Sequence, residues 1–235
     1  MNMKVMVLAA GKGTRMRELT QVTPKPLLRA GGRALIEHQI LKLRAAGFTE
    51  LVINHAWLGE QLEAALGDGS DLGVNITWSP EGEPLETAGG IAKALPLLGS
   101  EPFLVVNADI WTNYPFARLL QSLPEGRLAR LVLVPNPAHN LKGDFCLAAD
   151  GSLLRREAEA GPSATFSGIA VYDPKLFAGL EEGPCPLLPV LLDAISRGWA
   201  CGEQFAGTWI DIGTPERLAD LDTLLQKHTD QRKSS

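Results

Sequence analysis

Near its N-terminus the chain reads VMVLAAGKGTRM, from Val5 to Met16. Val5–Leu8 is continuously apolar, which is typical of a strand buried on both faces of a sheet. Gly11 and Gly13 follow directly, so the backbone there can approach a ligand closely, and successive N–H groups in such a turn favour an anion. The stretch therefore predicts a buried first strand that leads into an anion-binding loop.

Short apolar runs alternate with helical patterns through the first half of the chain, which indicates an α/β fold with a mainly parallel sheet. The later strands are expected at 51–53, 74–78, 103–106 and 131–134, and the helices at 34–46, 58–66 and 90–98. The second half reads differently. We expect short hairpin-like strands over 140–172 around Asp150-Gly151, a helix at 187–196, a strand at 208–212 and a final helix from Pro215 to about Gln226.

The chain contains neither a repeat nor a linker, so one domain over 1–227 with a flexible polar tail at 228–235 is expected. Its 22 basic and 27 acidic residues leave a net charge of −5, which argues against nucleic acid as a partner. Three widely spaced cysteines favour a reducing compartment. The first apolar run is too short for a signal peptide or a membrane span. We therefore expect a cytoplasmic protein with no membrane partner and no required protein partner.

Two common phosphate-binding motifs fail at the glycine loop. A P-loop needs Ser or Thr after Gly-Lys, where Gly13 stands, and the dinucleotide fingerprint needs a glycine where Met16 stands. The loop alone leaves a plain turn as an alternative. The segment TPKPL, Thr23–Leu27, adds a lysine held between two prolines, which restrict the backbone to an extended, stiff segment. Arg15 and Lys25 thus put two cations beside the loop, which suits a polyphosphate.

Together, these two segments resemble the nucleoside-diphosphate-sugar pyrophosphorylases, a family of sugar-1-phosphate nucleotidyltransferases. The resemblance implies a Rossmann-like α/β fold, a mixed, mainly parallel sheet flanked by helices. It also implies that Lys25 contacts the α-phosphate of a nucleoside triphosphate. The glycine-loop residues that it assigns to the same nucleotide are Gly11, Gly13, Thr14 and Arg15.

The resemblance extends along nearly the whole chain. Glu83–Gly90 resembles the base-recognition loop of the family, which assigns Leu85 and Gly90 to the nucleobase, although a glycine-rich helix entry is the alternative. Asn107-Ala108-Asp109 follows an apolar strand, with Ala108 where the family usually has Gly, and Asn107 is expected at the nucleotide. Asp211 matches the Trp-x-Asp-x-Gly-Thr motif. Asp109 and Asp211 are implied to hold Mg²⁺, a hard cation that prefers oxygen ligands.

The expected sugar site is Gly143, Glu157, Gly168 and Trp209. Here the chain departs from the family, because the Lys-Pro that usually follows the glutamate is absent after Glu157, and a surface charge is the alternative at that position. Ser167-Gly168 likewise stands where many members carry Asn-x-Gly.

The resemblance implies attack of a sugar-1-phosphate oxygen on the α-phosphorus, with pyrophosphate leaving. An anionic nucleophile needs no general base, so alignment and charge neutralisation by Arg15, Lys25, Asp109 and Asp211 are the expected catalysis. Four segments look most like members that use UTP and N-acetylmuramate α-1-phosphate in peptidoglycan recycling. Those segments are 54–59, 81–87, 143–145 and 165–168. The alternatives are mannose- or glucose-1-phosphate with GTP, dTTP or UTP, and a non-catalytic nucleotide-sugar sensor.

Overall fold

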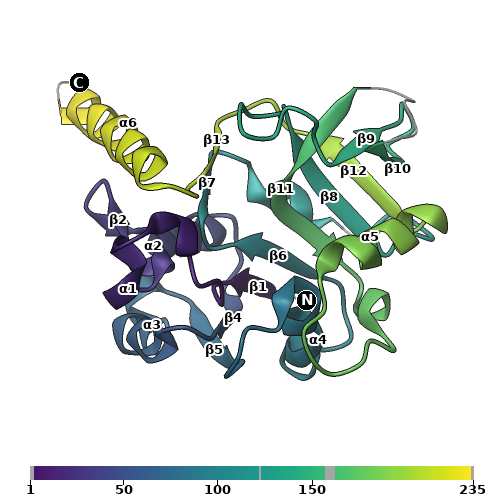
Figure 1. Ribbon diagram of the computed structural model, residues 1–235, viewed down its shortest axis with the longest axis horizontal. Coiled ribbons are helices and arrows are strands. Elements are labelled where there is room, and N and C mark those ends of the chain that lie inside the picture. The colour runs from purple at the N-terminus through teal and green to yellow at the C-terminus, as the bar shows by residue number, and fades with distance from the viewer. Residues whose placement is uncertain (1–2, 122, 157–161, 234–235) are drawn as a thin grey trace.

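The fold is described from a computed structural model, which covers residues 3–121, 123–156 and 162–233 (Figure 1). Strand β1 (Val5–Leu8) lies inside a nine-stranded sheet, with β4 (Glu50–His55) and β6 (Phe103–Asn107) parallel to it on either side. Beyond β4 lies β5 (Asn75–Pro80), also parallel. The expected parallel sheet is confirmed in this half.

The other half of the sheet makes it mixed. Strand β11 (Ser163–Tyr172) runs antiparallel to β6 and to β8 (Ala129–Val134), and β12 (Ala200–Gln204) pairs parallel to β8. Short hairpin strands over 140–172 were expected. This is correct for β9 (Phe145–Leu147) and β10 (Leu153–Arg155), which pair around the Asp150-Gly151 turn.

The expectation of short hairpin strands is wrong for β11, which is a ten-residue strand inside the sheet. Its register against β8 shifts between Phe166 and Ala170, and the polar pair Ser167-Gly168 at this irregularity interrupts the apolar run that marks a buried strand.

Helices cover both faces of the sheet. Val5 and Val7 join an apolar cluster with α2 (Leu35–Ala45) and α3 (Gly59–Leu66), whereas Met6 faces α4 (Glu86–Leu98) and α5 (Leu187–Ser196). Successive side chains of a strand point to opposite faces, so burial on both faces explains the unbroken apolar run.

Helix α4 starts four residues earlier than the expected Gly90. The glycines are not its entry but its packing surface. A Cβ at Gly89 would lie 2.3 Å from the Gly183 carbonyl oxygen, and one at Gly90 would lie 2.4 Å from Glu81 Oε1.

A smaller lobe stands beside the sheet (Figure 1). Helix α6 (Pro215–Lys233) packs on the hairpin of β2 (Arg29–Ala30) and β3 (Arg33–Ala34), with Met16 and Leu221 in their shared apolar cluster. We expected this helix to end near Gln226 with a tail from 228, but it continues to Lys233. Residues 227–233 contain no Gly or Pro that would interrupt the hydrogen bonds of a helical backbone.

The remaining strands and α-helix are α1 (Leu19–Val22), β7 (Ile110–Thr112) and β13 (Trp209–Asp211). Strands β7 and β13 form a separate antiparallel pair.

In the part of the chain that the structure describes, no helix combines the length and apolarity needed to cross a bilayer. Cys146, Cys185 and Cys201 form no disulfide bond with one another.

Candidate active site

A cavity of about 410 Å³ opens at the carboxyl ends of β1, β4 and β6. This is the edge at which open α/β sheets hold ligands. Seven residues predicted to bind the nucleotide or the metal line it: Gly11, Gly13, Thr14, Arg15, Lys25, Asn107 and Asp109. The tertiary structure therefore brings together groups that lie about a hundred positions apart in the sequence.

The glycine loop folds back onto the segment that carries Lys25. Gly13 has a left-handed backbone, with φ of 63°, and a Cβ there would lie 3.1 Å from Lys25 Cβ and 3.1 Å from Thr20 Cγ2. Only glycine avoids both the strain and the crowding. The close approach of the two segments explains why both are needed to build one wall of the cavity.

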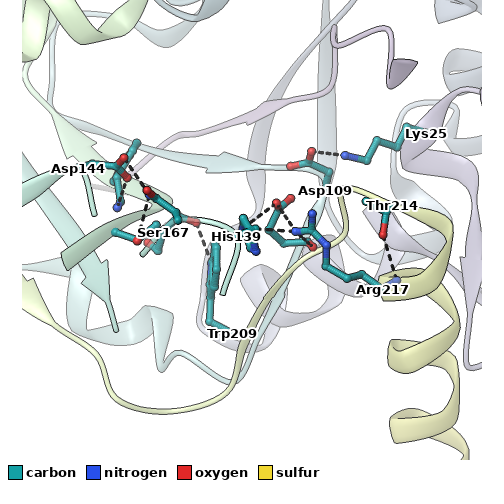
Figure 2. Close-up of polar contacts among 12 residues, drawn as sticks. Lys25, Asp109, His139, Asp144, Ser167, Trp209, Thr214 and Arg217 are labelled. Atoms are coloured by element: carbon teal, nitrogen blue, oxygen red, sulfur yellow. Dashed lines mark hydrogen bonds and ion pairs between the residues drawn. The ribbon is translucent and has the colours of Figure 1, made fainter. Parts of the chain in front are cut away.

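Lys25 is buried, with 7% of its surface exposed, and its ammonium donates to Asp109 Oδ2 (Figure 2). We expected an extended backbone here. Pro24 is extended, but Lys25 begins a 3-10 turn because its carbonyl accepts the N–H of Leu28. The turn still presents the ammonium at one place, beside the carboxylate of Asp109, which follows β6 by two residues.

Asp211 is brought next to Asp109 by β13. The Ile212 N–H donates to the Asp109 carbonyl at 2.9 Å, and Asp211 lies opposite Ile110 in the β7–β13 pair. Among the described residues no group of three or more His, Cys, Asp and Glu side chains could hold a metal ion. Any metal held by Asp109 and Asp211 must therefore take further ligands from water or substrate.

Arg217 is the cation at this site that sequence reasoning missed. From the first turn of α6 its Nη1 lies 2.6 Å from Asp211 Oδ2, and His139 Nε2 lies 3.4 Å from the same oxygen (Figure 2). A Cβ at Gly213 would lie 3.1 Å from Asp211 Oδ2 and from a guanidinium nitrogen of both Arg15 and Arg217. The sequence held one signal for Arg217. A cation in the first turn of a helix opposes the helix dipole, so an arginine at that position indicates a role other than stabilising the helix.

The predicted base-recognition residues Leu85 and Gly90 are not among the described residues that line this cavity. Glu81, Pro84 and Glu86 line it instead. The buried Glu81 carboxylate accepts from the Leu85 N–H at 2.9 Å and from Asn54 Nδ2 at 2.6 Å.

The Asn54 side-chain oxygen in turn accepts from the Ala9 N–H at 2.9 Å. A buried asparagine–glutamate pair thus ties the loop that leads into α4 to the end of β1. No spacing rule in the sequence pairs Asn54 with Glu81.

A second cavity, of about 380 Å³, shares Leu8, Thr87 and Asn107 with the first. Gly168, predicted to contact the sugar, lines it, and so does Asp144, which was not among the predicted site residues. The Asp144 carboxylate accepts from the Phe166 N–H at 2.8 Å and from Asn140 Nδ2 at 3.0 Å. The two cavities therefore adjoin each other at these three shared residues.

The other predicted sugar residues stand apart from this cavity. Gly143 is packed against Ala164, where a Cβ would lie 3.0 Å from its backbone nitrogen and oxygen. The Trp209 indole N–H donates to the Ser167 carbonyl at 2.9 Å (Figure 2), which ties β13 to the irregular part of β11. Glu157 lies outside the described residues.

Comparison with known proteins agrees with this geometry. The family model described as nucleotidyl transferase matches residues 4–143. The N-acetylmuramate alpha-1-phosphate uridylyltransferase of Neisseria meningitidis serogroup B is 52% identical, over 94% of this chain and 98% of that protein. The protein of the same description from Caulobacter vibrioides is 34% identical, over 90% and 92% of the two chains. The crystal structure of HddC from Yersinia pseudotuberculosis shares the fold, with a TM-score of 0.78 at 19% identity over 94% of this chain and 99% of that one.

Proposed function

The chain belongs to the nucleotidyl transferase family, and we propose that it transfers uridylate from UTP to N-acetylmuramate α-1-phosphate, forming UDP-N-acetylmuramate and pyrophosphate. The observation that carries the choice of substrates is the 52% identity to the Neisseria meningitidis uridylyltransferase over nearly the full length of both chains. N-acetylmuramate is a sugar of peptidoglycan, so we assign the reaction to peptidoglycan recycling in the cytoplasm.

The two adjoining cavities suit two substrates that react where the cavities share residues. In our proposal the triphosphate lies along the glycine loop and the sugar in the second cavity. Lys25, Asn107 and Asp109 then surround the α-phosphorus. A sugar-phosphate oxygen attacks it, the bond from the α-phosphorus to the bridging oxygen breaks, and pyrophosphate leaves with the electron pair. Positioning and charge neutralisation supply the catalysis, because the nucleophile is already anionic.

The cations have separate tasks in this proposal. Lys25 is held by Asp109 in the free protein, and its ammonium neutralises charge at the α-phosphate. The Arg15 guanidinium forms no ion pair with any described residue and lines the cavity beside the glycine loop. We assign Arg15 to the departing pyrophosphate, whose charge a planar guanidinium can bind through two hydrogen bonds.

We propose Mg²⁺ as the metal, held by Asp109 and Asp211. The donor set fits, because Mg²⁺ in proteins uses one or two carboxylates together with water and substrate phosphates. The two side chains are 31% and 17% exposed, so each is partly shielded but reachable. When bound, the ion supplies charge neutralisation between the two reacting phosphates.

Pyrophosphate release tests the proposal directly. ATP, GTP, dTTP and UTP are each combined with N-acetylmuramate-, N-acetylglucosamine-, glucose- and mannose-1-phosphate, in the presence of Mg²⁺. We expect the highest kcat/KM for UTP with N-acetylmuramate α-1-phosphate. A preference for GTP with mannose-1-phosphate would overturn the assignment of substrates, and no release from any pair would favour a nucleotide-sugar sensor.

A further inference from the structure

One residue in the wall of the second cavity, Tyr172, carries a buried hydroxyl that no described residue satisfies. Tyr172 is fully buried and lines the cavity, yet its hydroxyl is without a hydrogen-bond partner among the described residues. Buried tyrosine hydroxyls usually find a partner. Only Gln39 Oε1 and Trp111 Nε1 share this condition in the described part of the chain, and neither residue lines either of the two cavities described above.

The cavity changes character along β11. Three polar residues, Thr87, Asn107 and Asp144, line the second cavity, and two of them, Thr87 and Asn107, also line the first cavity. The polar end, where the two cavities adjoin, is therefore the mouth of the second cavity. Tyr172 lies four residues beyond Gly168, about 13 Å along the strand, and pairs with Phe103 at the start of β6. The cavity thus extends away from the catalytic edge, between the sheet and α5. Its body is apolar, with walls that include Leu8, Val105, Phe145, Phe166, Leu187 and Leu191.

The charge on these walls limits what can enter. Asp144 is the single charged side chain among the described lining residues, and no cation faces the cavity. An anionic group would meet a like charge and lose its hydration in an apolar chamber, whereas a neutral amide would lose much less. The occupant is therefore a neutral, partly apolar group that carries one hydrogen-bond acceptor.

We infer that this chamber takes the 2-acetamido group of the sugar, with the Tyr172 hydroxyl donating to the acetamide carbonyl oxygen. Tyr172 is then a specificity residue for N-acetylated sugar phosphates, and the carboxylate of a lactyl substituent points elsewhere. This inference rests on the proposed function. Burial raises the pKa of the Tyr172 hydroxyl above its ordinary value, so the group remains protonated and able to donate.

The test compares UDP-N-acetylglucosamine with UDP-glucose, which differ only in the acetamido group, by calorimetric binding to the wild type and to Tyr172→Phe. We expect the wild type to bind the acetylated compound more tightly. We expect this preference to fall by about 3- to 10-fold in Tyr172→Phe, the usual worth of one neutral hydrogen bond. Because the hydroxyl has no partner in the free protein, the melting temperature of Tyr172→Phe should be unchanged or higher.

Tyr114→Phe is the matched control. Tyr114 is also buried, but its hydroxyl donates to Glu203, and it lines neither cavity. This variant should lose thermal stability while the ratio of the two affinities stays at the wild-type value.

Three results would overturn the inference. They are an unchanged ratio in Tyr172→Phe, a wild type that does not prefer the acetylated compound, and a melting temperature of Tyr172→Phe as low as that of Tyr114→Phe. Binding of UDP alone to the wild type separates this failure from failure of the proposed function. If neither UDP nor its sugars bind, the choice of UTP is wrong. If UDP binds and the ratio does not change, only the role of Tyr172 is wrong.

Discussion

Arg217 Nη1 lies 2.6 Å from Asp211 Oδ2 and 2.9 Å from the Asp211 carbonyl oxygen. One guanidinium therefore holds both the side chain and the backbone of the residue that we assign to the metal. His139 approaches the same carboxylate from the loop that leads to Gly143 (Figure 2). Asp211 is thus the point at which α6 and the loop that carries His139 meet.

Replacing Arg217 with Ala should lower kcat by about 10- to 100-fold, the usual cost of losing a residue that orients a metal ligand. Arg217→Lys should recover part of the loss, because lysine keeps the charge but not the two-pronged geometry. Pyrophosphate release at saturating substrates measures both. Arg197→Ala is the control, since it removes an arginine that pairs with Asp193 on an exposed helix face. A kcat of Arg217→Ala within twofold of the wild type would contradict the positioning role.

Lys25→Ala should lower kcat by about 10²- to 10³-fold, by analogy with the loss of one preorganised electrostatic donor. The variant also loses the ion pair with Asp109, so a thermal melt must show that it remains folded. Arg29→Ala, at an exposed position of the β2–β3 hairpin, should keep wild-type turnover. Near-wild-type turnover of folded Lys25→Ala at saturating substrates would refute the role of this lysine.

Chelation with EDTA should abolish pyrophosphate release by the wild type, and added Mg²⁺ should restore it. Asp109→Asn should reduce activity on the order of 10²-fold at any Mg²⁺ concentration, because it removes a charged ligand worth several kcal/mol of transition-state stabilisation. Its circular dichroism spectrum should match that of the wild type. Asp193→Asn, at an exposed helical position, is the control. An unchanged Mg²⁺ titration curve for Asp109→Asn would count against the assigned metal site.

Gly168→Ala should destabilise the fold more than a comparable change elsewhere. Gly168 has a φ of 78°, and a Cβ there would lie 2.6 Å from Asn107 Nδ2. Gly179 has a φ of 83° with open space around it, so Gly179→Ala carries the backbone strain alone. We expect Gly168→Ala to lose about 1–3 kcal/mol more in free energy of unfolding than Gly179→Ala, the usual cost of overpacking. Urea unfolding measures both, and equal losses would show that Asn107 moves aside freely.

Lys42 should make stability depend on pH in the alkaline range. Burial lowers its pKa from 10.5 to about 8, although its ammonium donates to the Thr112 carbonyl and lies over the Trp111 ring. Between about pH 8 and pH 10.5 the unfolded lysine binds a proton that the folded one has lost, so this residue's contribution to stability rises with pH.

The comparison with Lys42→Met isolates that contribution. Urea unfolding is measured at pH 7, 8, 9 and 10 for both proteins. Above pH 8, the free energy of unfolding of the wild type should increase relative to that of Lys42→Met. A difference that stays constant over this range would show that Lys42 remains protonated in the folded protein.

Local sequence determined most of the first half of the fold and indicated the residues of the candidate site. The unbroken apolar runs of β1, β4 and β6 and the bounds of α5 were predicted correctly, since burial on both faces of a sheet and helical periodicity leave local patterns. The glycine loop and the segment around Lys25 were also recognisable, because each is a short motif whose residues act close together in the chain.

The tertiary structure alone decided how distant residues meet. The place of β11 inside the sheet, the pairing of Arg217 with Asp211 and the buried link from Asn54 to Glu81 all join residues that no spacing rule connects. The unpaired hydroxyl of Tyr172 is of the same kind, since in the sequence it reads as one more apolar position of a strand. Such features depend on which strands pair and on how helices cover them, and these choices follow from the burial of the whole core.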